Sequence, residues 1–339
     1  LMTTNETLER IARSVWEPGD LVRDALRDLT GDLVIIGAGG KMGVSLSRMA
    51  AAALDGTRTV YAVSRFSDPA ARAELEENGV ETVSCDLLDA DQIAALPDAA
   101  AVVFMAGRKF GTTGDSAPTW ASNTIIPALV AQRYRDSRIA VFSSGNVYPL
   151  VPSESGGAHE GIEPQPVGEY AQSCLGREKI FTYYAERNGT PISIIRLNYA
   201  NDGRYGVLTD IAKNIIAGTP VSLGNGMVNV IWQGDANRFA LATLAHADNP
   251  PRIINVTGPE TASVRRLAEE IGGRLGLAPT FEGTEAPTAL LSDAGRSFGL
   301  FGYPQMPLAG MLDTTVEWIR GGGALLDKPT HFTEREGKY

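Results

Sequence analysis

Cysteine, histidine and long apolar runs are scarce in this sequence, and each shortage argues against a class of protein. The 339 residues contain only two cysteines, Cys85 and Cys174, too few for a disulfide framework, so we expect a reduced cytoplasmic protein. Three scattered histidines, His159, His246 and His331, suggest no metal site. No apolar run reaches the roughly 18 residues of a membrane-spanning helix, and the first residues lack the basic-then-apolar pattern of a signal peptide.

An excess of basic residues is also missing. Acidic residues outnumber lysine and arginine by 40 to 30, and the formal charge of −10 argues against nucleic acid or an anionic membrane as a partner. Apolar residues make up 43% of the chain and charged residues 21%, which is ordinary for a globular protein. The length allows one large domain or two interlocked ones with a substantial core.

What the sequence does contain is a dense glycine turn directly after an apolar run. Leu33–Ile36 is continuously apolar, as expected of a parallel strand buried on both faces, and a helical pattern follows the turn. The glycines follow the spacing G-x-x-G-x-x-G, whereas G-x-G-x-x-G fails because Met42 stands at its third glycine position. Such a turn leaves the N–H groups of a helix N-terminus facing an anion, here a dinucleotide pyrophosphate. The cofactor-binding residues predicted in this turn are Gly37, Gly40, Lys41, Met42 and Gly43.

Further apolar segments recur at intervals that leave room for a helix between them. We expect strands at 59–65, 80–84, 101–105 and 139–142. Strands that alternate with helices in this way form a doubly wound parallel sheet. The predicted fold class is therefore α/β, a Rossmann fold with a smaller C-terminal α/β lobe for the substrate.

The end of the second of these strands bears on which dinucleotide binds. NAD-specific sites carry a ribose-binding acid about 20 residues after the glycine turn, whereas Ser64 and Arg65 stand there in this chain. A hydroxyl and a guanidinium can bind a 2′-phosphate, which a carboxylate would repel. We therefore predict NADP, with NAD as the alternative. Ala106 and Gly107, after the fourth strand, are small enough for the chain to pass close to the cofactor.

A hydroxyl and a tyrosine mark the predicted place of chemistry. Ser144 stands at the end of the fifth strand, and Tyr170 opens a helix 26 residues later. Serine can orient a carbonyl oxygen, while tyrosine exchanges its proton as hydride moves to or from a nicotinamide. This pair, after that glycine turn, closely resembles the extended short-chain dehydrogenase/reductases, which include nucleotide-sugar epimerases, dehydratases and sugar reductases. The resemblance covers nearly all of residues 31–320 and includes Asn123, Arg196-Leu-Asn198-Tyr and Asn255-Val-Thr-Gly258.

The resemblance implies roles for particular residues. Ser144 would be the catalytic hydroxyl and Tyr170 the catalytic acid/base. Asp86 and Leu87, just after the third strand, would pack beside the adenine. Asn146 and Asn198 are the corresponding candidates for substrate binding.

One position departs from the family pattern. The family's tyrosine is followed four residues later by a lysine on the same helix face. That lysine holds the nicotinamide ribose and lowers the pKa of the tyrosine. In this chain the corresponding position, 174, is a cysteine. Lys179 points to the opposite side of the helix, and Arg177 lies about 10 Å further along the axis. Without a nearby cation we expect the pKa of Tyr170 near its ordinary value of about 10. Tyr170 would then donate a proton to a carbonyl at neutral pH but not abstract one from an alcohol.

Two further absences narrow the substrate. Dehydratases of this family carry an Asp-Glu pair directly after the catalytic hydroxyl, where this chain has Gly145-Asn146. Nucleotide-sugar enzymes hold the substrate diphosphate with an arginine shortly before a position like Asp235, and no arginine lies between positions 204 and 238. A smaller, non-nucleotide substrate fits better. Arg108 and Lys109 are candidates to hold its carboxylate.

The chain is expected to divide into several parts. Residues 1–30 form an N-terminal extension, in which apolar residues at helical spacing on either side of Pro18-Gly19 predict two short amphipathic helices, packed against the sheet edge or, alternatively, in a subunit contact. A dinucleotide-binding domain is expected at 31–201, to which 228–256 returns, and a substrate lobe at 202–227 and 257–320. Residues 321–339 are expected to form a surface tail. Two helices with apolar faces, near 119–133 and 170–186, would suit a homodimer contact common in the family.

Together these observations predict an NAD(P)-dependent oxidoreductase or epimerase. Its substrate would be a small sugar, a sugar acid or a related hydroxy-carbonyl compound. The cysteine at position 174 leaves an alternative open, namely an NADP(H)-binding regulatory or sensor protein with impaired catalysis.

Overall fold

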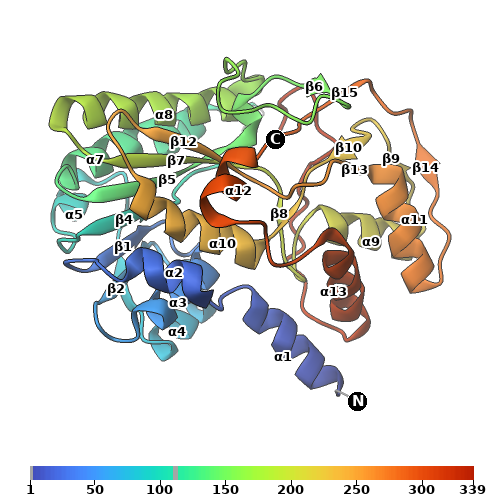
Figure 1. Ribbon diagram of the computed structural model, residues 1–339, viewed down its shortest axis with the longest axis horizontal. Coiled ribbons are helices and arrows are strands. Elements are labelled where there is room, and N and C mark those ends of the chain that lie inside the picture. Colours follow the sequence, from blue (N-terminus) through green and yellow to red (C-terminus); the bar gives the residue numbers. More distant parts are fainter. Residues whose placement is uncertain (1–2, 110–113) are drawn as a thin grey trace.

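The computed structural model describes residues 3–109 and 114–339, and its largest element is a seven-stranded parallel sheet in the order β3-β2-β1-β4-β5-β7-β12 (Figure 1). The chain proceeds from β1 in one direction and from β4 in the other, so a crevice opens at the carboxyl ends of these two strands. The predicted doubly wound α/β fold is confirmed. The strands are β1 Leu33–Ile36, β2 Val60–Ser64, β3 Glu81–Ser84, β4 Ala101–Phe104, β5 Arg138–Ser144, β7 Ile192–Leu197 and β12 Arg252–Val256.

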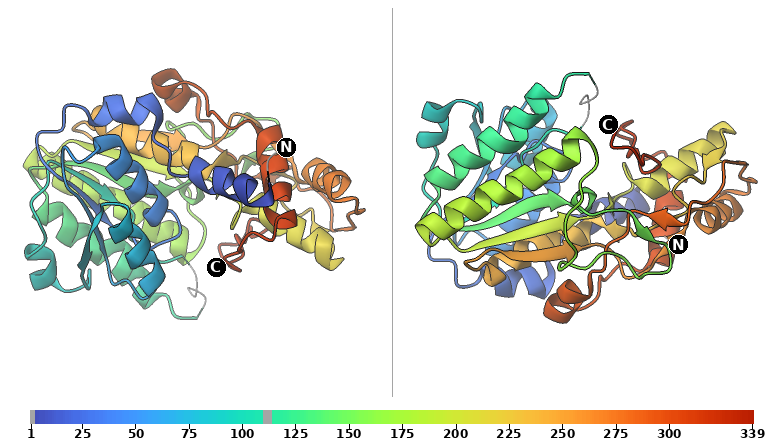
Figure 2. Two further views of the ribbon diagram at one scale, coloured as in Figure 1. Left: turned by 90° about the horizontal axis from the view of Figure 1, so that it is seen from below. Right: turned by 90° about the horizontal axis from the view of Figure 1, so that it is seen from above.

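Helices cover both faces of this sheet, as Figure 2 shows. In β1, Leu33 and Ile35 enter one apolar core while Val34 and Ile36 enter the other, because successive side chains of a strand point to opposite faces. This explains why the strand has no polar position. One core includes α2 Gly19–Leu26, α3 Gly43–Leu54, α4 Pro69–Glu77 and α10 Gln233–Ala242, and the other includes α5 Ala90–Ala94, α7 Ile126–Arg133 and α8 Gly168–Asn188.

A second lobe with its own apolar core lies beside the carboxyl ends of the strands. Its helices are α1 Thr4–Ser14, α9 Val207–Ala217, α11 Val264–Leu275 and α13 Leu308–Arg320. Phe332, from the tail, is buried in the same core. The remaining elements are short: α6 Ala117–Trp120, α12 Gly295–Phe301, β6 Val151–Pro152, β8 Ala200–Asn201, β9 Val221–Ser222, β10 Met227–Val228, β11 Ile231–Trp232, β13 Ala262–Ser263, β14 Phe281–Glu282 and β15 Thr288–Ala289.

The two N-terminal helices form where the periodicity predicts them, but they pack elsewhere than expected. The sheet ends at β3 and β12, whereas α2 packs on α3 and α10, and α1 packs on α13 of the second lobe. The expected position at the sheet edge is therefore wrong. The apolar stripe of α2 carries Val22 and Leu26 into the core over α3, and that of α1 carries Ile11 into the second core.

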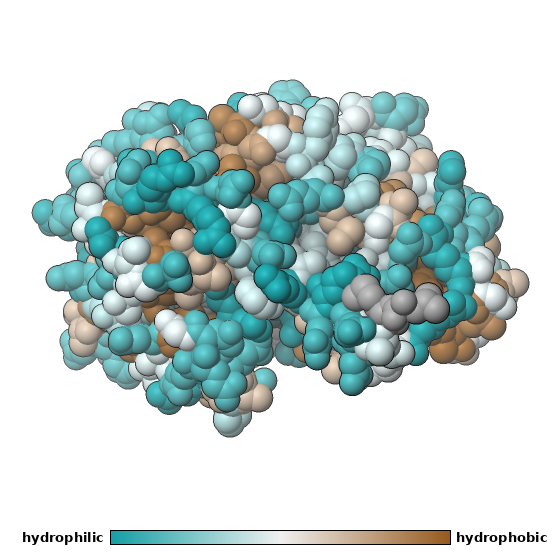
Figure 3. Space-filling model, turned by 60° about the horizontal axis from the view of Figure 1, so that its bottom comes forward, coloured by the Kyte–Doolittle hydropathy of each residue, from teal (hydrophilic) through white to brown (hydrophobic). Residues whose placement is uncertain are grey.

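The surface is mostly hydrophilic on the face shown in Figure 3, with separate smaller apolar patches. None of the helices formed by residues 3–109 and 114–339 is both long and apolar enough to cross a membrane.

Candidate active site

The glycine turn after β1 brings backbone close to backbone and leaves space for a ligand. Gly37 has φ +88°, and a Cβ added there would lie 2.6 Å from the backbone nitrogen of Ala106. At Gly43 an added Cβ would lie 2.4 Å from the carbonyl oxygen of Ala38. Gly40 faces open space, since only one atom, at 3.5 Å, lies near its added Cβ. The first turn of α3 has no side-chain cap, so its N–H groups are available to an anion such as a pyrophosphate.

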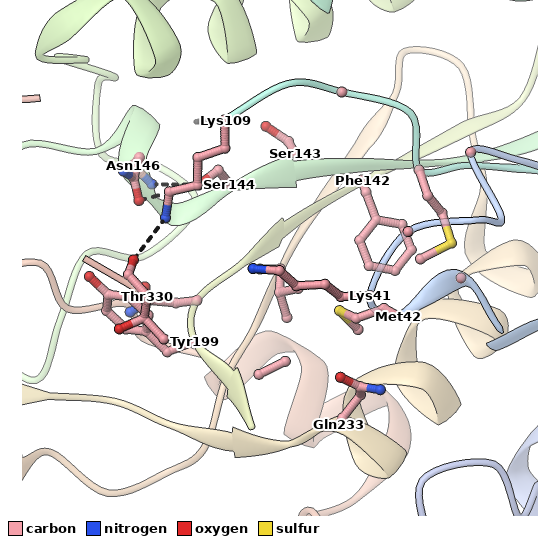
Figure 4. Close-up of a pocket in the computed structure, with 18 of the residues that line it drawn as sticks. Lys41, Met42, Lys109, Phe142, Ser143, Ser144, Asn146, Tyr199, Gln233 and Thr330 are labelled. Atoms are coloured by element: carbon pink, nitrogen blue, oxygen red, sulfur yellow. Dashed lines mark hydrogen bonds between the residues drawn. The ribbon is translucent and has the colours of Figure 1, made fainter. Parts of the chain in front are cut away.

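A cavity of about 360 Å³ runs from this turn across the carboxyl ends of the central strands (Figure 4). It joins residues predicted separately for cofactor binding, chemistry and substrate binding. The predicted residues that line it are Gly37, Gly40, Lys41, Met42, Gly43, Gly107, Lys109, Ser144, Asn146, Tyr170 and Asn198.

The predicted catalytic pair meets in this cavity. Ser144 ends β5, and its Oγ accepts a hydrogen bond of 3.1 Å from the backbone N–H of Asn146. Tyr170 lies in the first turn of α8 and lines the same cavity. The serine and the tyrosine thus face one space from two different elements.

A buried ion pair fixes those two elements relative to each other. Glu178 of α8 accepts bonds of 3.0 and 2.7 Å from the guanidinium of Arg196 in β7. The same carboxylate accepts a bond of 2.5 Å from the hydroxyl of Ser143 in β5. Because both ionic side chains are almost fully buried, these bonds hold the middle of α8 against β7 and against the end of β5.

The pKa of Tyr170 differs from the sequence-based expectation. Desolvation raises this pKa well above its ordinary value of 10, the neighbouring Cys174 thiol adds to the rise, and Arg177 opposes it. Burial also raises the pKa of Cys174. The expected value near 10 is therefore too low, because the sequence pattern does not report how little water reaches the phenol. Both side chains are neutral at physiological pH.

Arg177 lies closer to the site than its position along the helix suggests. Helical side chains lean toward the N-terminus, and this one reaches back to donate to the Asn123 side-chain oxygen at 2.7 Å and to the Phe142 carbonyl at 2.8 Å. One of its terminal nitrogens would be 2.5 Å from a Cβ added at Gly107, which lines the cavity. A buried guanidinium thus stands directly behind the cavity wall. By contrast, Lys179 is exposed on the other side of α8.

Asn123 holds the loop after β4 in place. It lies in a π-helical turn, Ala121–Ile125, and is fully buried. Its side chain accepts from the backbone N–H of Arg108 and donates to the backbone carbonyl of the same residue, both at 3.0 Å, and donates to Ser173 at 2.8 Å. Arg108, predicted to bind a substrate carboxylate, does not line the cavity; Asn123 anchors its backbone beside the wall instead.

Two lysines are the charged side chains among the described residues that line the cavity. Lys109 Nζ donates to the Thr330 carbonyl at 3.5 Å and lies 5.7 Å from the centre of the Tyr170 ring (Figure 4). Lys41 Nζ lies 3.6 Å from the centre of the Tyr205 ring. Desolvation lowers the pKa of each lysine to about 8, so both are cationic at neutral pH. An anionic group of a ligand would be attracted to this cavity.

The residues predicted for the adenosine half of the cofactor lie outside the cavity. Ser64 ends β2 against the glycine turn, where its Oγ would lie 2.6 Å from a Cβ added at Gly39. Arg65 and Asp86 are exposed, and Leu87 packs on the core under β3. Ala106 is buried next to Gly37 and forms the far side of the turn. Ser64, Arg65, Asp86 and Leu87 continue from the glycine turn toward the edge at β3, whereas Ala106 follows β4 on the other side of β1.

Several lining residues were not predicted from the sequence. Gln233 opens α10 and donates to Ser45 at 3.0 Å, and Tyr199 directly follows the predicted Asn198. Thr330 comes from the tail, and no local pattern in the sequence places it here. The other lining residues that were not predicted are Met105, Phe142, Ser143, Leu197, Ala200 and Tyr205.

Comparison with known proteins agrees with this arrangement. A model of the NAD dependent epimerase/dehydratase family matches residues 33–257. The dTDP-glucose 4,6-dehydratase DesIV from Streptomyces venezuelae, solved with NAD and TYD bound, superposes with a TM-score of 0.73 at 22% identity, over 85% of this chain and 97% of that one. The UDP-glucose 4-epimerase from Thermotoga maritima superposes with a TM-score of 0.72 at 16% identity, over 86% of this chain and 99% of that one. These likenesses show the fold. A search of curated protein sequences found no significant match.

The family match spans the parts of the molecule that build the site. It begins at the first residue of β1 and ends just after β12, and it includes the glycine turn, Ser144 and Tyr170. The predicted resemblance to the extended short-chain dehydrogenase/reductases is confirmed, as is the prediction of an enzyme of the oxidoreductase type that uses a nicotinamide dinucleotide. The chain belongs to the NAD dependent epimerase/dehydratase family.

Proposed function

We propose that this protein is an NAD(P)-dependent oxidoreductase or epimerase that acts on a small sugar, a sugar acid or a related hydroxy-carbonyl compound. The observation that carries the proposal is the shared cavity, in which Ser144 and Tyr170 face the glycine turn. A hydroxyl pair near a dinucleotide-binding turn suits the interconversion of a carbonyl and an alcohol.

The residues of the turn fit a dinucleotide. Gly37, Gly40 and the uncapped start of α3 would hold its pyrophosphate, and Gly107 would lie close to its nicotinamide end. When bound, this cofactor supplies or accepts the hydride. Related structures are described with NAD, whereas Ser64 and the exposed Arg65 favour the 2′-phosphate of NADP.

The chain's own residues supply the proton that the carbonyl oxygen of the substrate takes up. Ser144 orients the carbonyl oxygen of the substrate by hydrogen bonding, and Tyr170 donates its phenolic proton to that oxygen. Because desolvation keeps Tyr170 neutral, proton donation is favoured at neutral pH and proton abstraction from an alcohol is disfavoured. Reduction is therefore the direction that this site supports best.

The cations of the cavity indicate the substrate. Lys41 and Lys109 would hold a carboxylate, and Asn146 and Asn198 would hydrogen-bond hydroxyl groups. No arginine is found among the described residues that line the cavity. Because the two lysines are point charges that can hold a carboxylate or a phosphate alike, the preference for a sugar acid over a sugar diphosphate rests on the size of the cavity, about 360 Å³.

Cys174, which stands where the family carries its lysine, favours one alternative, a dinucleotide-binding sensor without turnover. The test is fluorescence titration of the purified protein with NADPH and NADH, followed by carbonyl-reduction assays of wild type and Cys174→Lys. Cys85→Ala is the control, since Cys85 is the other buried cysteine and lies outside the cavity.

The proposal expects micromolar NADPH binding, measurable reduction by wild type and faster reduction by Cys174→Lys. NADPH binding without turnover in either form would identify the sensor. Failure of both nucleotides to bind would refute the enzyme proposal at its first step.

A further inference from the structure

We propose that residues 330–339 form a fixed wall beside the substrate site, in which Thr330 lines the cavity and Tyr339 supports the lining residues Tyr170 and Asn146, and that this wall restricts the site to small anionic hydroxy-carbonyl compounds that carry no nucleotide. The inference rests on the proposed function, because it specifies the substrate of the same cavity. The tail was expected to lie on the surface, and many of its residues are exposed, but Thr330 and Phe332 are buried. In both views of Figure 2 the tail lies between the large sheet and α9.

The tail is anchored to the second lobe by a dense set of hydrogen bonds. Arg335 donates to the side-chain oxygen of Asn225 at 2.5 Å, to the Thr288 carbonyl at 2.6 Å and to the Thr288 hydroxyl at 2.8 Å. Asn225, which is buried, donates in turn to the Phe332 carbonyl at 2.7 Å. Bonds between buried polar groups fix the path of a chain, because breaking them leaves the groups unsatisfied.

A second anchor lies at the cavity itself. The Asp210 carboxylate accepts bonds from the backbone N–H of Thr330 at 2.8 Å and from its hydroxyl at 2.7 Å. The carbonyl of Thr330 accepts the bond from Lys109, so the tail joins α9 to the loop after β4. The tail therefore bridges the two sides of the cavity.

Two glycines allow the tail to touch the start of α8. Gly337 has φ +75° and Gly168 has φ +83°. A Cβ added at Gly337 would lie 2.2 Å from the Val167 carbonyl oxygen, and one added at Gly168 would lie 2.3 Å from the Gly337 carbonyl oxygen. Each backbone thus occupies the space that a side chain of the other would need. The contact depends on glycine at both positions.

Tyr339 is placed against the catalytic residues as a result. Its hydroxyl accepts a bond of 2.5 Å from the Asn146 side-chain amide. Its ring lies 5.5 Å from the ring of Tyr170, centre to centre, and 4.7 Å from Lys109 Nζ. Desolvation raises the pKa of Tyr339 to about 12, so its hydroxyl is neutral. A substrate at Tyr170 would therefore meet Lys109 directly, while Tyr339 would fix Tyr170 and Asn146 from behind.

The size of the cavity argues for a small substrate. With the tail in place it measures about 360 Å³, while pockets for a single small-molecule ligand range over about 300–1,000 Å³. The same cavity includes the glycine turn, so the nicotinamide end of the cofactor must share it. Little room is left beside the cofactor for a nucleotide attached to the substrate.

The experiment compares two ligands that share a sugar acid, D-glucuronate and UDP-D-glucuronate. Their dissociation constants are measured by calorimetry on the full chain, with and without saturating NADPH. The variant is Gly337→Ala, which pushes the tail off α8. Gly322→Ala is the matched control, because Gly322 has nearly the same φ, +73°, but nothing within 4 Å of its added Cβ.

Wild type and Gly322→Ala should bind D-glucuronate at least tenfold more tightly than UDP-D-glucuronate. In Gly337→Ala this preference should shift at least tenfold toward the UDP compound. Tyr339→Phe, which keeps the ring and loses the hydroxyl, should weaken D-glucuronate binding several-fold and leave UDP-D-glucuronate excluded.

Two results would overturn the inference. One is wild-type binding of UDP-D-glucuronate as tight as that of D-glucuronate, and the other is an unchanged preference in Gly337→Ala. The proposed function fails separately: a protein that binds neither NADPH nor NADH but shows the shift in preference would contradict the enzyme proposal and support the wall.

Discussion

Two side chains behind and beside Tyr170 decide what the tyrosine can do. Cys174 contributes no charge, whereas the Arg177 guanidinium lies behind Gly107 and lowers the pKa of Tyr170 against the larger effect of desolvation. We infer that Arg177 is a positioning residue. It holds Asn123 and the carbonyl of Phe142 while it places a positive charge near the phenol.

Replacing Arg177 by methionine separates these two roles. Arg177→Met should lower the free energy of unfolding by about 1–3 kcal/mol, because buried acceptors lose a donor, and should slow carbonyl reduction. Adding Cys174→Lys to this variant returns a cation one helical turn from Tyr170, so it should restore reduction without restoring stability. Urea unfolding and steady-state assays measure the two effects. A double variant that recovers neither activity nor a wild-type pH profile would contradict the electrostatic role.

The charge on Lys109 makes ligand binding depend on pH. Desolvation lowers its pKa to about 8, so the ammonium is present below that pH and is lost as the pH rises through it. The dissociation constant of D-glucuronate should therefore be constant at neutral pH and rise above about pH 8. Lys109→Met should bind more weakly at neutral pH and show a shallower rise, with Lys41 responsible for the remainder.

Calorimetry between about pH 7 and pH 9 tests this expectation. Lys179→Met is the control, because Lys179 is exposed on the outer side of α8 and should leave both affinity and pH dependence unchanged. A wild-type affinity that stays flat across this range would show that Lys109 does not hold the anion.

Among the secondary-structure elements, α10 connects the N-terminal helices to the floor of the cavity. Gly234, near the start of α10, would bring an added Cβ within 2.1 Å of the Ser14 carbonyl oxygen at the end of α1. Next to it, Trp232 donates to the Ser14 hydroxyl at 3.0 Å and Asn237 donates to the Val15 carbonyl at 2.9 Å. The close approach of α1 to α10 therefore requires a glycine.

Gly234→Ala should lower the free energy of unfolding by about 1–3 kcal/mol through overpacking. Gly273→Ala in α11 is the matched control, since Gly273 is also helical but has nothing within 4 Å of its added Cβ. It should raise stability by about 0.5–1 kcal/mol, the usual gain of alanine over glycine in a helix. Urea unfolding measures the free energy of unfolding of both variants. Equal changes in the two variants would mean that the close contact with Ser14 does not affect stability.

The elements that were predicted well are those whose signal is local. β1 was predicted to its last residue because an unbroken apolar run and a glycine turn delimit it. The contacts of the Arg177 side chain and the course of the tail were not predicted, because both depend on residues far apart in the sequence. Thr330 meets Asp210 across 120 positions, and Tyr339 meets Asn146 across 193. The apolar stripes of α1 and α2 likewise predicted two helices but not the surfaces on which they pack.

At the scale of the whole molecule, the surface over α7 and α8 is the place where a second copy is expected to bind. The two helices pack side by side, and Ile125 and Tyr183 on this part of the molecule are 50% and 54% exposed. Burying such side chains favours a twofold dimer.

Light scattering should find a homodimer, and the double variant Ile125→Glu/Tyr183→Glu should be monomeric, because it places carboxylates in the contact. Ile216→Glu is the control, since Ile216 on α9 is also 50% exposed and lies elsewhere. Loss of the dimer in Ile216→Glu would place the contact between copies on another surface. A monomeric wild type would show that this contact does not form.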